Sequence, residues 1–321
     1  MTAAASLTFV KPTVNQEFPI TADVVMPVID VEVKVEGGGP GLSLVWGAEL
    51  SFKCNSCPHG TGRIISHPKV TGPPSTDGKF SIRFTQIRGG TVTISVNAKV
   101  GTQMLSASLG VKIVGTNPTK AQVAVQFPDE ILRKIANFES NGMRQFNASG
   151  GSTSPCPLFS GDNHGGVGMM QVTYPQPTDD EVWSWIANMN RGKQILADKK
   201  PIAKGYPQQV RNSAGFKKLV TDYTKARKDA KKSELTITLP DFTDDQLSKD
   251  ALRGYNGWAG QDAFSLALHE FRVKLDTNGN LVVTEQPGGV AGTCEWEQVP
   301  ASDRPSIGDP DYVNHVLKQA V

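Results

Sequence analysis

Within the first 120 or so residues, short runs alternate hydrophobic and polar positions or are rich in β-branched residues, which is the pattern of β-strands. The clearest runs lie at 31–35, 80–84, 91–96 and 110–114. Turn-forming sequences separate them, at 37–40, 73–75, 77–78 and 89–90. Strands at this spacing predict an all-β sandwich, and Trp46 is the candidate for its central core aromatic.

The periodicity changes after residues 115–119, whose sequence Gly-Thr-Asn-Pro-Thr predicts a linker. Beyond the linker, Pro128, Asp129 and Glu130 open a helix in which apolar residues recur at helical spacing as far as Phe138. The dipeptide 141–142, Asn-Gly, predicts the end of this helix.

Two further helices are indicated by capping boxes that begin at Thr178 and Thr243. Between them the sequence predicts a lysine-rich helix and a short strand at 235–239. A hairpin is expected around Asn278 and Gly279, and a last helix from about Pro310 to the end. These elements predict a mostly α domain with small β insertions, and no internal repeat is visible.

The whole chain is therefore expected to hold two domains, an all-β sandwich over residues 1–118 and a mostly α domain over 125–321. The strand pattern of the first domain resembles the immunoglobulin-like modules of bacterial surface and phage-associated proteins. Such modules usually bind ligands or act as spacers, and no set of catalytic residues is recognised in the first domain.

Composition and charge exclude some classes of function. The net charge of +2 is too small to indicate nucleic-acid binding, and the basic run 225–232 is interpreted as a solvated helix face. The sequence contains no run of about twenty apolar residues, so no membrane span is predicted. Residues 1–16 lack the basic start and apolar core of a secretory signal peptide, so export by another route, or a trimmed start, is expected.

The four cysteines leave their chemistry open. Cys54 and Cys57 form a C-x-x-C, and zinc there would need two more ligands, for which only His59 and His67 are close. The alternative is a loop with two thiols or a local disulfide. Cys156 and Cys294 stand alone and could pair in an oxidising compartment. No metal and no cofactor is predicted.

Glu139 is the candidate catalytic residue. It lies four residues after Ile135 and seven after Leu132, on the apolar face of the helix over 129–141 and in its last turn. Burial and the helix dipole both disfavour the carboxylate, so we expect a raised pKa. A glycosidase needs such a protonated carboxyl as its general acid. The structural alternative is an acid satisfied by a buried Arg or a backbone group.

Short motifs follow one another along the second domain, at residues 138–142, 168–171, 188–196, 252–257 and 311–317. In this order they resemble the motifs E-S, G-L-M-Q, N-I-x-x-G-x-x-x-L, A-Y-N-x-G and Y-V-x-x-V of goose-type lysozymes and soluble lytic transglycosylases. Met169 stands for the family's Leu, and either Asn188 or Asn190 matches its Asn. The inserts at about 199–239 and 272–305 have no counterpart in the family core.

The resemblance implies a lysozyme-like catalytic domain whose Glu139 protonates the bond between N-acetylmuramic acid and N-acetylglucosamine. It further implies a saccharide groove formed by Ser140, Gly168, Met170, Gln171, Asn190, Tyr255 and Asn256, with the Tyr255 hydroxyl close to Glu139. The alternative for Tyr255 is a core aromatic, and for the two methionines it is packing. Trp183 and Trp185 are interpreted as core residues, whereas Trp258 fits a sugar-stacking surface and simple packing equally.

The resemblance also bears on the reaction. Goose-type lysozymes carry an Asp just before the glycine-rich approach to G-L-M-Q, and Asp162 stands nine residues before Gln171. Asp162 is thus the candidate base that positions the attacking water, with His164 as a neighbour, and its structural alternative is an Asx-turn. The predicted enzyme is a muramidase, a glycoside hydrolase. The alternative is a lytic transglycosylase, which forms 1,6-anhydromuramoyl ends with Glu139 alone.

The combination of a wall-cutting domain, a spacer module and no signal peptide resembles antibacterial effectors of type VI secretion and phage-associated lysins. It implies synthesis in the cytoplasm and non-Sec export to the periplasm or cell wall of a target bacterium. Expected partners are peptidoglycan strands, secretion machinery and an immunity protein that inhibits the toxin. Two different classes of function stay open, namely an inactive glycan-binding domain, and a receptor or adhesin built on the first domain.

Overall fold

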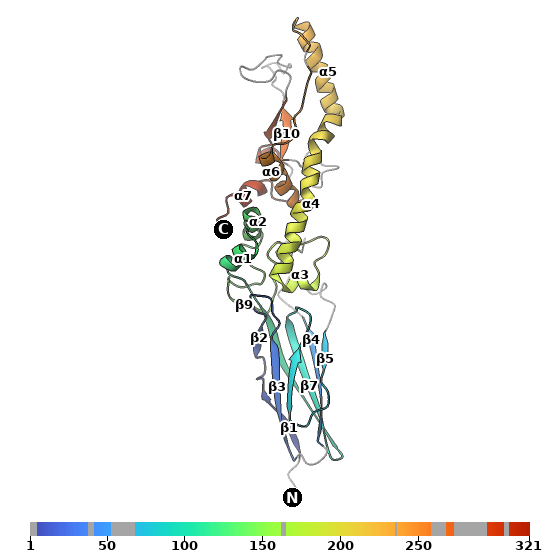
Figure 1. Cartoon of the computed structure of the whole chain (residues 1–321), viewed down its shortest axis with the longest axis vertical. Coiled ribbons are helices and arrows are strands. Elements are labelled where there is room, and N and C mark those ends of the chain that lie inside the picture. Colours follow the sequence, from blue (N-terminus) through green and yellow to red (C-terminus); the bar gives the residue numbers. More distant parts are fainter. Residues whose placement is uncertain are drawn as a thin grey trace. The chain divides into compact units, whose positions relative to one another are not determined.

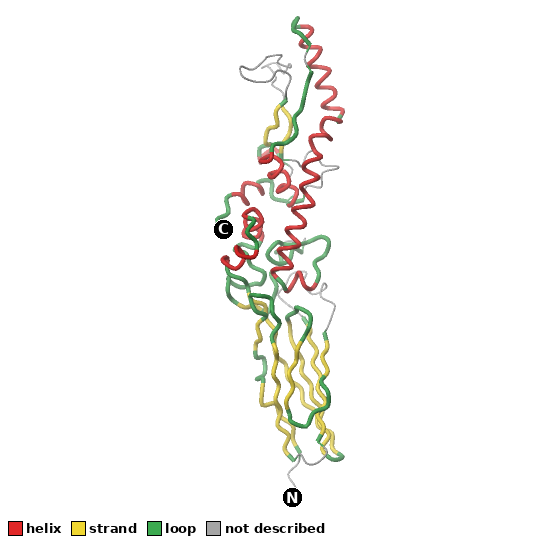
Figure 2. Tube along the Cα trace, in the orientation of Figure 1, coloured by secondary structure: helices red, strands yellow, loops and turns green. Residues whose placement is uncertain are grey.

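The computed structural model describes residues 5–37, 42–52, 68–161, 165–234, 236–257, 268–272, 294–304 and 308–321. The chain divides into two compact units, of which the first comprises Met1–Gly192 with Gln319–Val321 and the second Lys193–Lys318. Figure 1 labels the elements along the chain, and Figure 2 separates helices from strands by colour.

The strands of the first unit form two main sheets. One is antiparallel and has the order β1 (Ser6–Lys11), β3 (Val28–Glu36), β6 (Lys79–Arg83). The other has the order β2 (Glu17–Pro19), β8 (Gln103–Thr116), β7 (Gly90–Val100), β4 (Ser43–Ser51), β5 (Lys69–Thr71). The short strand β9 (Thr153–Ser154) pairs with the end of β8. All the described pairings in the second sheet are antiparallel except that of β2 with β8.

The predicted alternation is confirmed in these strands. Along β7, Val92, Ile94, Val96 and Ala98 are buried, because in an extended strand every second side chain points to the same face. Three of the four clearest runs lie within β3, β7 and β8, and the run 80–84 extends one residue beyond the end of β6. Trp46 is a core residue, as predicted, and its indole N–H donates to the Ser75 hydroxyl at 2.9 Å.

The first unit also contains the helices α1 (Lys120–Gln126), α2 (Glu130–Glu139) and α3 (Asp179–Trp183). Thr119 and Thr178 both form the reciprocal capping box, in which each side chain satisfies a backbone N–H of the other cap position. The single helix predicted after Thr178 is interrupted at Ser184, whose backbone is extended. A second helix, α4 (Trp185–Asn212), begins directly afterwards, and the division between the units falls inside it.

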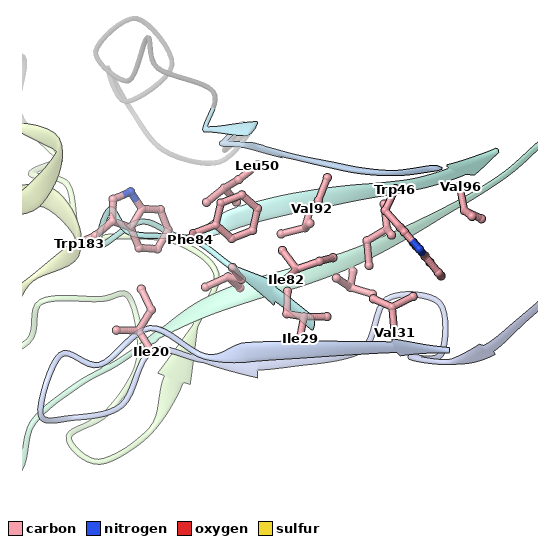
Figure 3. Packing of buried hydrophobic residues seen from close by; sticks show 14 of the residues in the cluster. Ile20, Ile29, Val31, Trp46, Leu50, Ile82, Phe84, Val92, Val96 and Trp183 are labelled. Atoms are coloured by element: carbon pink, nitrogen blue, oxygen red, sulfur yellow. The ribbon is translucent and has the colours of Figure 1, made fainter. Parts of the chain in front are cut away.

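Helices and strands of the first unit share one apolar core. Trp183 at the end of α3 is buried in the same cluster as Ile20, Leu50 and Phe84, as Figure 3 shows. Its ring meets that of Phe52 edge-on, with 5.1 Å between the ring centroids. An ion pair between Arg88, which is buried, and Asp179 fastens the start of α3 to the segment before β7. The helical segment therefore belongs to the core of the strands.

The predicted fold class, an all-β immunoglobulin-like sandwich followed by a mostly α domain, is wrong. The structure has mixed helix (34%) and strand (29%) content with several sheets, and it shows no clear all-β immunoglobulin-like domain followed by a mostly α domain. The residues 115–119 are also not a linker. Gly115 and Thr116 pair with β9, and Asn117 is completely buried. The predicted boundary near residue 118 thus falls inside the first unit.

The second unit contains the rest of α4, then α5 (Ala214–Asp229), α6 (Asp244–Tyr255), a 3-10 turn (Ala301–Asp303) and α7 (Tyr312–Leu317). A two-stranded antiparallel sheet joins β10 (His269–Arg272) and β11 (Glu295–Gln298). Its core contains a group of aromatic rings, in which the ring of Trp296 lies 4.7 Å from that of Phe242 and 5.9 Å from that of Tyr206, centroid to centroid.

The predictions for this unit had mixed outcomes. Thr243 forms the predicted capping box, but the last helix is shorter than expected and ends at Leu317. Residues 236–239 form no strand, because only Thr238 makes a ladder-like bond, accepting from the Cys294 N–H. The hairpin predicted around residues 278–279 lies outside the described residues. Of the helices in the described ranges, none is both long enough and apolar enough to cross a bilayer.

Gly89→Ala is expected to destabilise the first unit by about 1–3 kcal/mol, the usual cost of overpacking a core. A Cβ at this position would lie 2.2 Å from Cζ3 of Trp183, whose ring is enclosed by core residues and cannot give way freely. Denaturant unfolding of the full chain measures the change. The control is Gly110→Ala in β8, where no atom lies within 4 Å of the added carbon. Equal stability of the two variants would contradict the tight packing of α3 against the strands.

Candidate active site

Helix α2 places Glu139 at its last position. The helix begins where predicted, because the carboxylate of Asp129 accepts from the N–H groups of Ile131 at 2.9 Å and Leu132 at 3.2 Å. Leu132, Ile135 and Ala136 are buried, which confirms the predicted apolar face. The Glu139 side chain is half-buried at the C-terminal end. It is thus both accessible in part and close to the negative pole of the helix dipole.

The chain reverses sharply after α2. Asn141, Gly142 and Met143 all have positive φ, at 49°, 119° and 57°, which is uncommon for residues with a Cβ. The Gly142 N–H closes the helix by donating to the Asn137 carbonyl at 3.0 Å. The Asn-Gly stop predicted from the sequence is confirmed. Three left-handed residues in succession need external support to persist.

Ser140 supplies part of this support. Its hydroxyl donates to the Ala136 carbonyl at 2.6 Å and accepts from the Arg144 N–H at 2.8 Å, and the Arg144 side chain returns to the Ser140 carbonyl at 3.0 Å. The residue is only 1% exposed. Ser140, predicted to bind saccharide, is therefore a positioning residue for the turn that follows Glu139.

Asn117 anchors the segment beyond this turn. Its side-chain carbonyl accepts from the N–H groups of Gln145 and Phe146, both at 2.8 Å. Its amide donates to the carbonyls of Phe146 (3.0 Å), Ala148 (2.7 Å) and Ser149 (3.3 Å). One buried side chain thus contacts five backbone groups, with the two amide hydrogens shared among three carbonyls. This residue was not predicted, because the sequence Gly-Thr-Asn-Pro-Thr is typical of an exposed linker.

The G-M-M-Q motif forms a tight turn, here called the 168–171 turn. Val167 and Val172 flank it and exchange two backbone hydrogen bonds, each 3.1 Å long. Gly168 has a φ of 73° and Gln171 a φ of 46°, so both ends of the turn are left-handed. The Gln171 side chain is half-buried and its amide donates to the Gly168 carbonyl at 2.8 Å.

Two fully buried amide side chains form hydrogen bonds with the backbone of the 168–171 turn. The Gln145 carbonyl accepts from the Met169 N–H at 3.1 Å, and the Asn188 carbonyl accepts from the Met170 N–H at 2.8 Å. The Asn188 amide also donates to the Val167 carbonyl at 3.0 Å. Asn188 is therefore the residue of the third motif that contacts the turn. Asn190, the predicted saccharide ligand, is exposed and makes none of these contacts.

Close packing explains the glycines of these motifs. A Cβ on Gly168 would lie 2.5 Å from the Gln145 amide group and 2.7 Å from that of Asn188. A Cβ on Gly192 would lie 2.4 Å from the terminal methyl carbon of Met170. Met170 itself is completely buried, so its side chain packs against α4 and does not line a groove. The motifs around 168 and 188 thus contact each other in the first unit, and Gln145 connects them to the segment that follows Glu139.

The fourth and fifth motifs lie together in the second unit. Tyr255 ends α6 and Asn256 caps it, and both side chains are half-buried. Gly308, shortly before α7, packs so closely on Asn256 that a Cβ there would lie 2.1 Å from its Oδ1 atom. In α7 the amide of Asn314 donates to the Asp311 carboxylate at 2.6 Å. The predicted proximity of Tyr255 to Glu139 concerns residues of different units and stays a prediction.

Asp250 in α6 is a fully buried acid that was not predicted. Its carboxylate accepts from the Leu268 N–H at 3.0 Å and pairs with Nδ1 of His269, and all three residues are buried. Burial raises the pKa of Asp250, while the hydrogen bond from His269 opposes that shift. Its position among Leu247, Ala251 and Leu252 in the helix was the available signal. The pair fastens β10 to α6 and is too enclosed to meet a polymer.

Several predicted residues lie outside the described residues. These are Asp162, His164, Trp258 and the C-x-x-C group with Cys54, Cys57, His59 and His67. Among the described cysteines, Cys156 and Cys294 form no disulfide, and burial raises the pKa of the Cys294 thiol. Trp183 and Trp185 are core residues, as predicted.

The arrangement in the first unit can serve general acid chemistry. A half-buried carboxyl ends a helix, and a network of buried amides joins the adjoining turn to a second strained turn, at 168–171. Strained backbone that is held by its surroundings gathers at functional sites more often than elsewhere. No family model matches the chain, and no curated protein matches it.

Proposed function

We propose that this chain cleaves the β-1,4 bond between N-acetylmuramic acid and N-acetylglucosamine in peptidoglycan, with Glu139 as the general acid. One observation carries the proposal. The Ser140 hydroxyl binds the Arg144 N–H, and the side chain of the next residue, Gln145, binds the 168–171 turn at Met169. These hydrogen bonds connect the segment that follows the half-buried Glu139 to the 168–171 turn, which supports assigning the motifs to one site.

As the general acid in this reaction, Glu139 must meet two requirements. It must hold a proton near neutral pH, and it must present that proton to the leaving oxygen while positive charge develops on the sugar ring. Its place at the helix C-terminus disfavours the carboxylate, because the dipole there is negative. Its partial exposure leaves a path for a saccharide to approach. Gln171, also half-buried and next to the turn, is the residue we assign to contact the sugar.

The second step decides the class of product. We propose that water completes the reaction and that Asp162 positions it as a base, which makes the enzyme a muramidase. In the alternative reaction the muramoyl 6-hydroxyl attacks, no second carboxylate is needed, and 1,6-anhydro ends form. The two-carboxylate requirement of an inverting hydrolase separates these reactions.

Mass spectrometry of the soluble muropeptides is the experiment that tests this proposal. We expect reducing ends from the wild-type chain and a rate about 10²-fold lower for Asp162→Asn, because the water would lose its base. The matched control is Asp23→Asn, an exposed acid of the first unit, which should retain the wild-type rate. Products with 1,6-anhydro ends would contradict the role of Asp162, and the absence of any glycan cleavage would contradict the whole proposal.

A further inference from the structure

The positive charge of this chain is concentrated in one segment of the second unit. Residues 193–232 hold 12 of the 33 Lys and Arg residues but only 3 of the 31 Asp and Glu residues. Because the whole chain has a net charge of only +2, the remainder is net acidic. Nine lysines of this segment are exposed, and we call them the lysine surface: Lys193, Lys200, Lys204, Lys217, Lys218, Lys225, Lys228, Lys231 and Lys232.

Helix geometry aligns part of the lysine surface on α4. Lys193, Lys200 and Lys204 are spaced by seven and four residues, so they share one face of the helix and extend about 17 Å along it. Residues of the other face, including Ala203 and Tyr206, are buried in the core of the second unit. The apolar face of α4 is thus covered by the core of the second unit, and its lysines point to solvent.

The same division holds on α5, the helix that follows α4 (Figure 1). Phe216, Tyr223 and Arg227 make up its buried face. The opposite face carries four exposed lysines, at positions 217, 218, 225 and 228. Only one described ion pair engages any of the four, between Lys218 and Asp222. Close positive charges on one face repel one another, and a negatively charged ligand would relieve that repulsion.

The chemistry of this surface limits what it can bind. It contains no large exposed hydrophobic or aromatic side chain anywhere in the fully described segment 193–232. A membrane-binding helix and a protein hot spot would need apolar side chains, and single-stranded nucleic acid would need aromatic rings for stacking. The exposed cations are all lysines, which act as mobile point charges and suit separated anionic groups on a flexible chain.

We infer that the lysine surface binds the carboxylates of the peptides that peptidoglycan strands carry at intervals. This inference rests on the proposed function, since it assigns a second contact with the same polymer. A linear strand presents repeated negative charges, and the surface presents repeated positive ones. The result is weak, salt-sensitive retention on the wall, which keeps the enzyme near successive cleavable bonds.

The test measures sedimentation of the full chain with purified sacculi, on ice and in the Glu139→Gln background, so that binding is separated from lysis. One variant replaces Lys217, Lys218, Lys225 and Lys228 by Gln. We expect its binding at low salt to be about tenfold weaker or more, and the wild-type surface to lose binding as salt rises. Circular dichroism checks that α5 still forms. The matched control replaces four exposed lysines of the first unit, Lys34, Lys69, Lys79 and Lys99, and should bind within about twofold of wild type.

Chemical changes to the probe identify the anion. Sacculi whose carboxylates are converted to amides should lose the binding, whereas sacculi stripped of phosphodiester polymers should keep it. Equal loss in the control variant, undiminished binding to amidated sacculi, or equally strong binding to duplex DNA would overturn the inference. These outcomes are distinct from failure of the proposed function, which would show as absent glycan cleavage by the wild-type chain.

Discussion

Glu139→Gln is expected to lower the rate of cell-wall lysis by about 10²–10⁴-fold, the usual contribution of a general acid. The amide has nearly the same shape as the carboxyl but holds no proton that it can transfer to the leaving oxygen. The side chain is half-buried at the end of α2, so the change removes neither core volume nor the helix cap at Asp129. We therefore expect the free energy of unfolding to change by less than about 1 kcal/mol.

The comparison variant for this prediction is Glu130→Gln. This residue lies at the first position of the same helix, where its carboxylate pairs with Lys134 at 2.9 Å on the surface. It should keep the wild-type rate, because the Glu130 carboxylate is 62% exposed and an ion pair to such a group contributes little. Lysis is followed as the clearing of purified sacculi and as new reducing ends, and denaturant unfolding reports stability. Wild-type lysis by a folded Glu139→Gln chain would contradict the assignment of the acid.

Asn117→Ala is expected to lower the free energy of unfolding of the first unit by about 3–5 kcal/mol. The N–H groups of Gln145 and Phe146 are buried and would lose the one partner described for them, whereas the carbonyls of Phe146 and Ser149 would keep a second hydrogen bond. Each unsatisfied buried group costs about 1–3 kcal/mol, although relaxation and water entry recover part of the sum. A domain of this kind has only about 5–15 kcal/mol of stability, so the effect would be large.

This change should also affect activity without touching a reacting atom. Asn117 orders the backbone of Gln145, and the Gln145 side chain in turn holds the 168–171 turn. We expect a lower rate of lysis even under conditions in which the variant is fully folded. The matched control is Asn97→Ala, which removes an exposed Asn whose described hydrogen bond is with Ser106, and should cost little. A similar loss of stability in both variants would contradict the anchoring role of Asn117.

The sequence alone determined the features that depend on near neighbours. The period-two alternation located β3, β6, β7 and β8, because strand faces follow directly from residue spacing. The capping residues at 129, 178 and 243 began their helices as expected, since a cap bonds to backbone only two or three residues away. The same local rules placed Glu139 in the last turn of a helix with one buried face.

The tertiary structure decided whatever depends on contacts between distant segments. Residues 115–119 look like a linker, yet Asn117 is buried because its partners lie about thirty residues further along the chain. Asn188 and Asn190 match the family motif equally well in the sequence. Only the structure shows that Asn188 is the one that contacts the 168–171 turn. Ser140 and Met170 matched a binding motif but are enclosed by packing. Trp183 of α3 packs in the same core as the strand residues. Residues far apart in the sequence can share a core, because burial of apolar surface depends on position in space and not on distance along the chain.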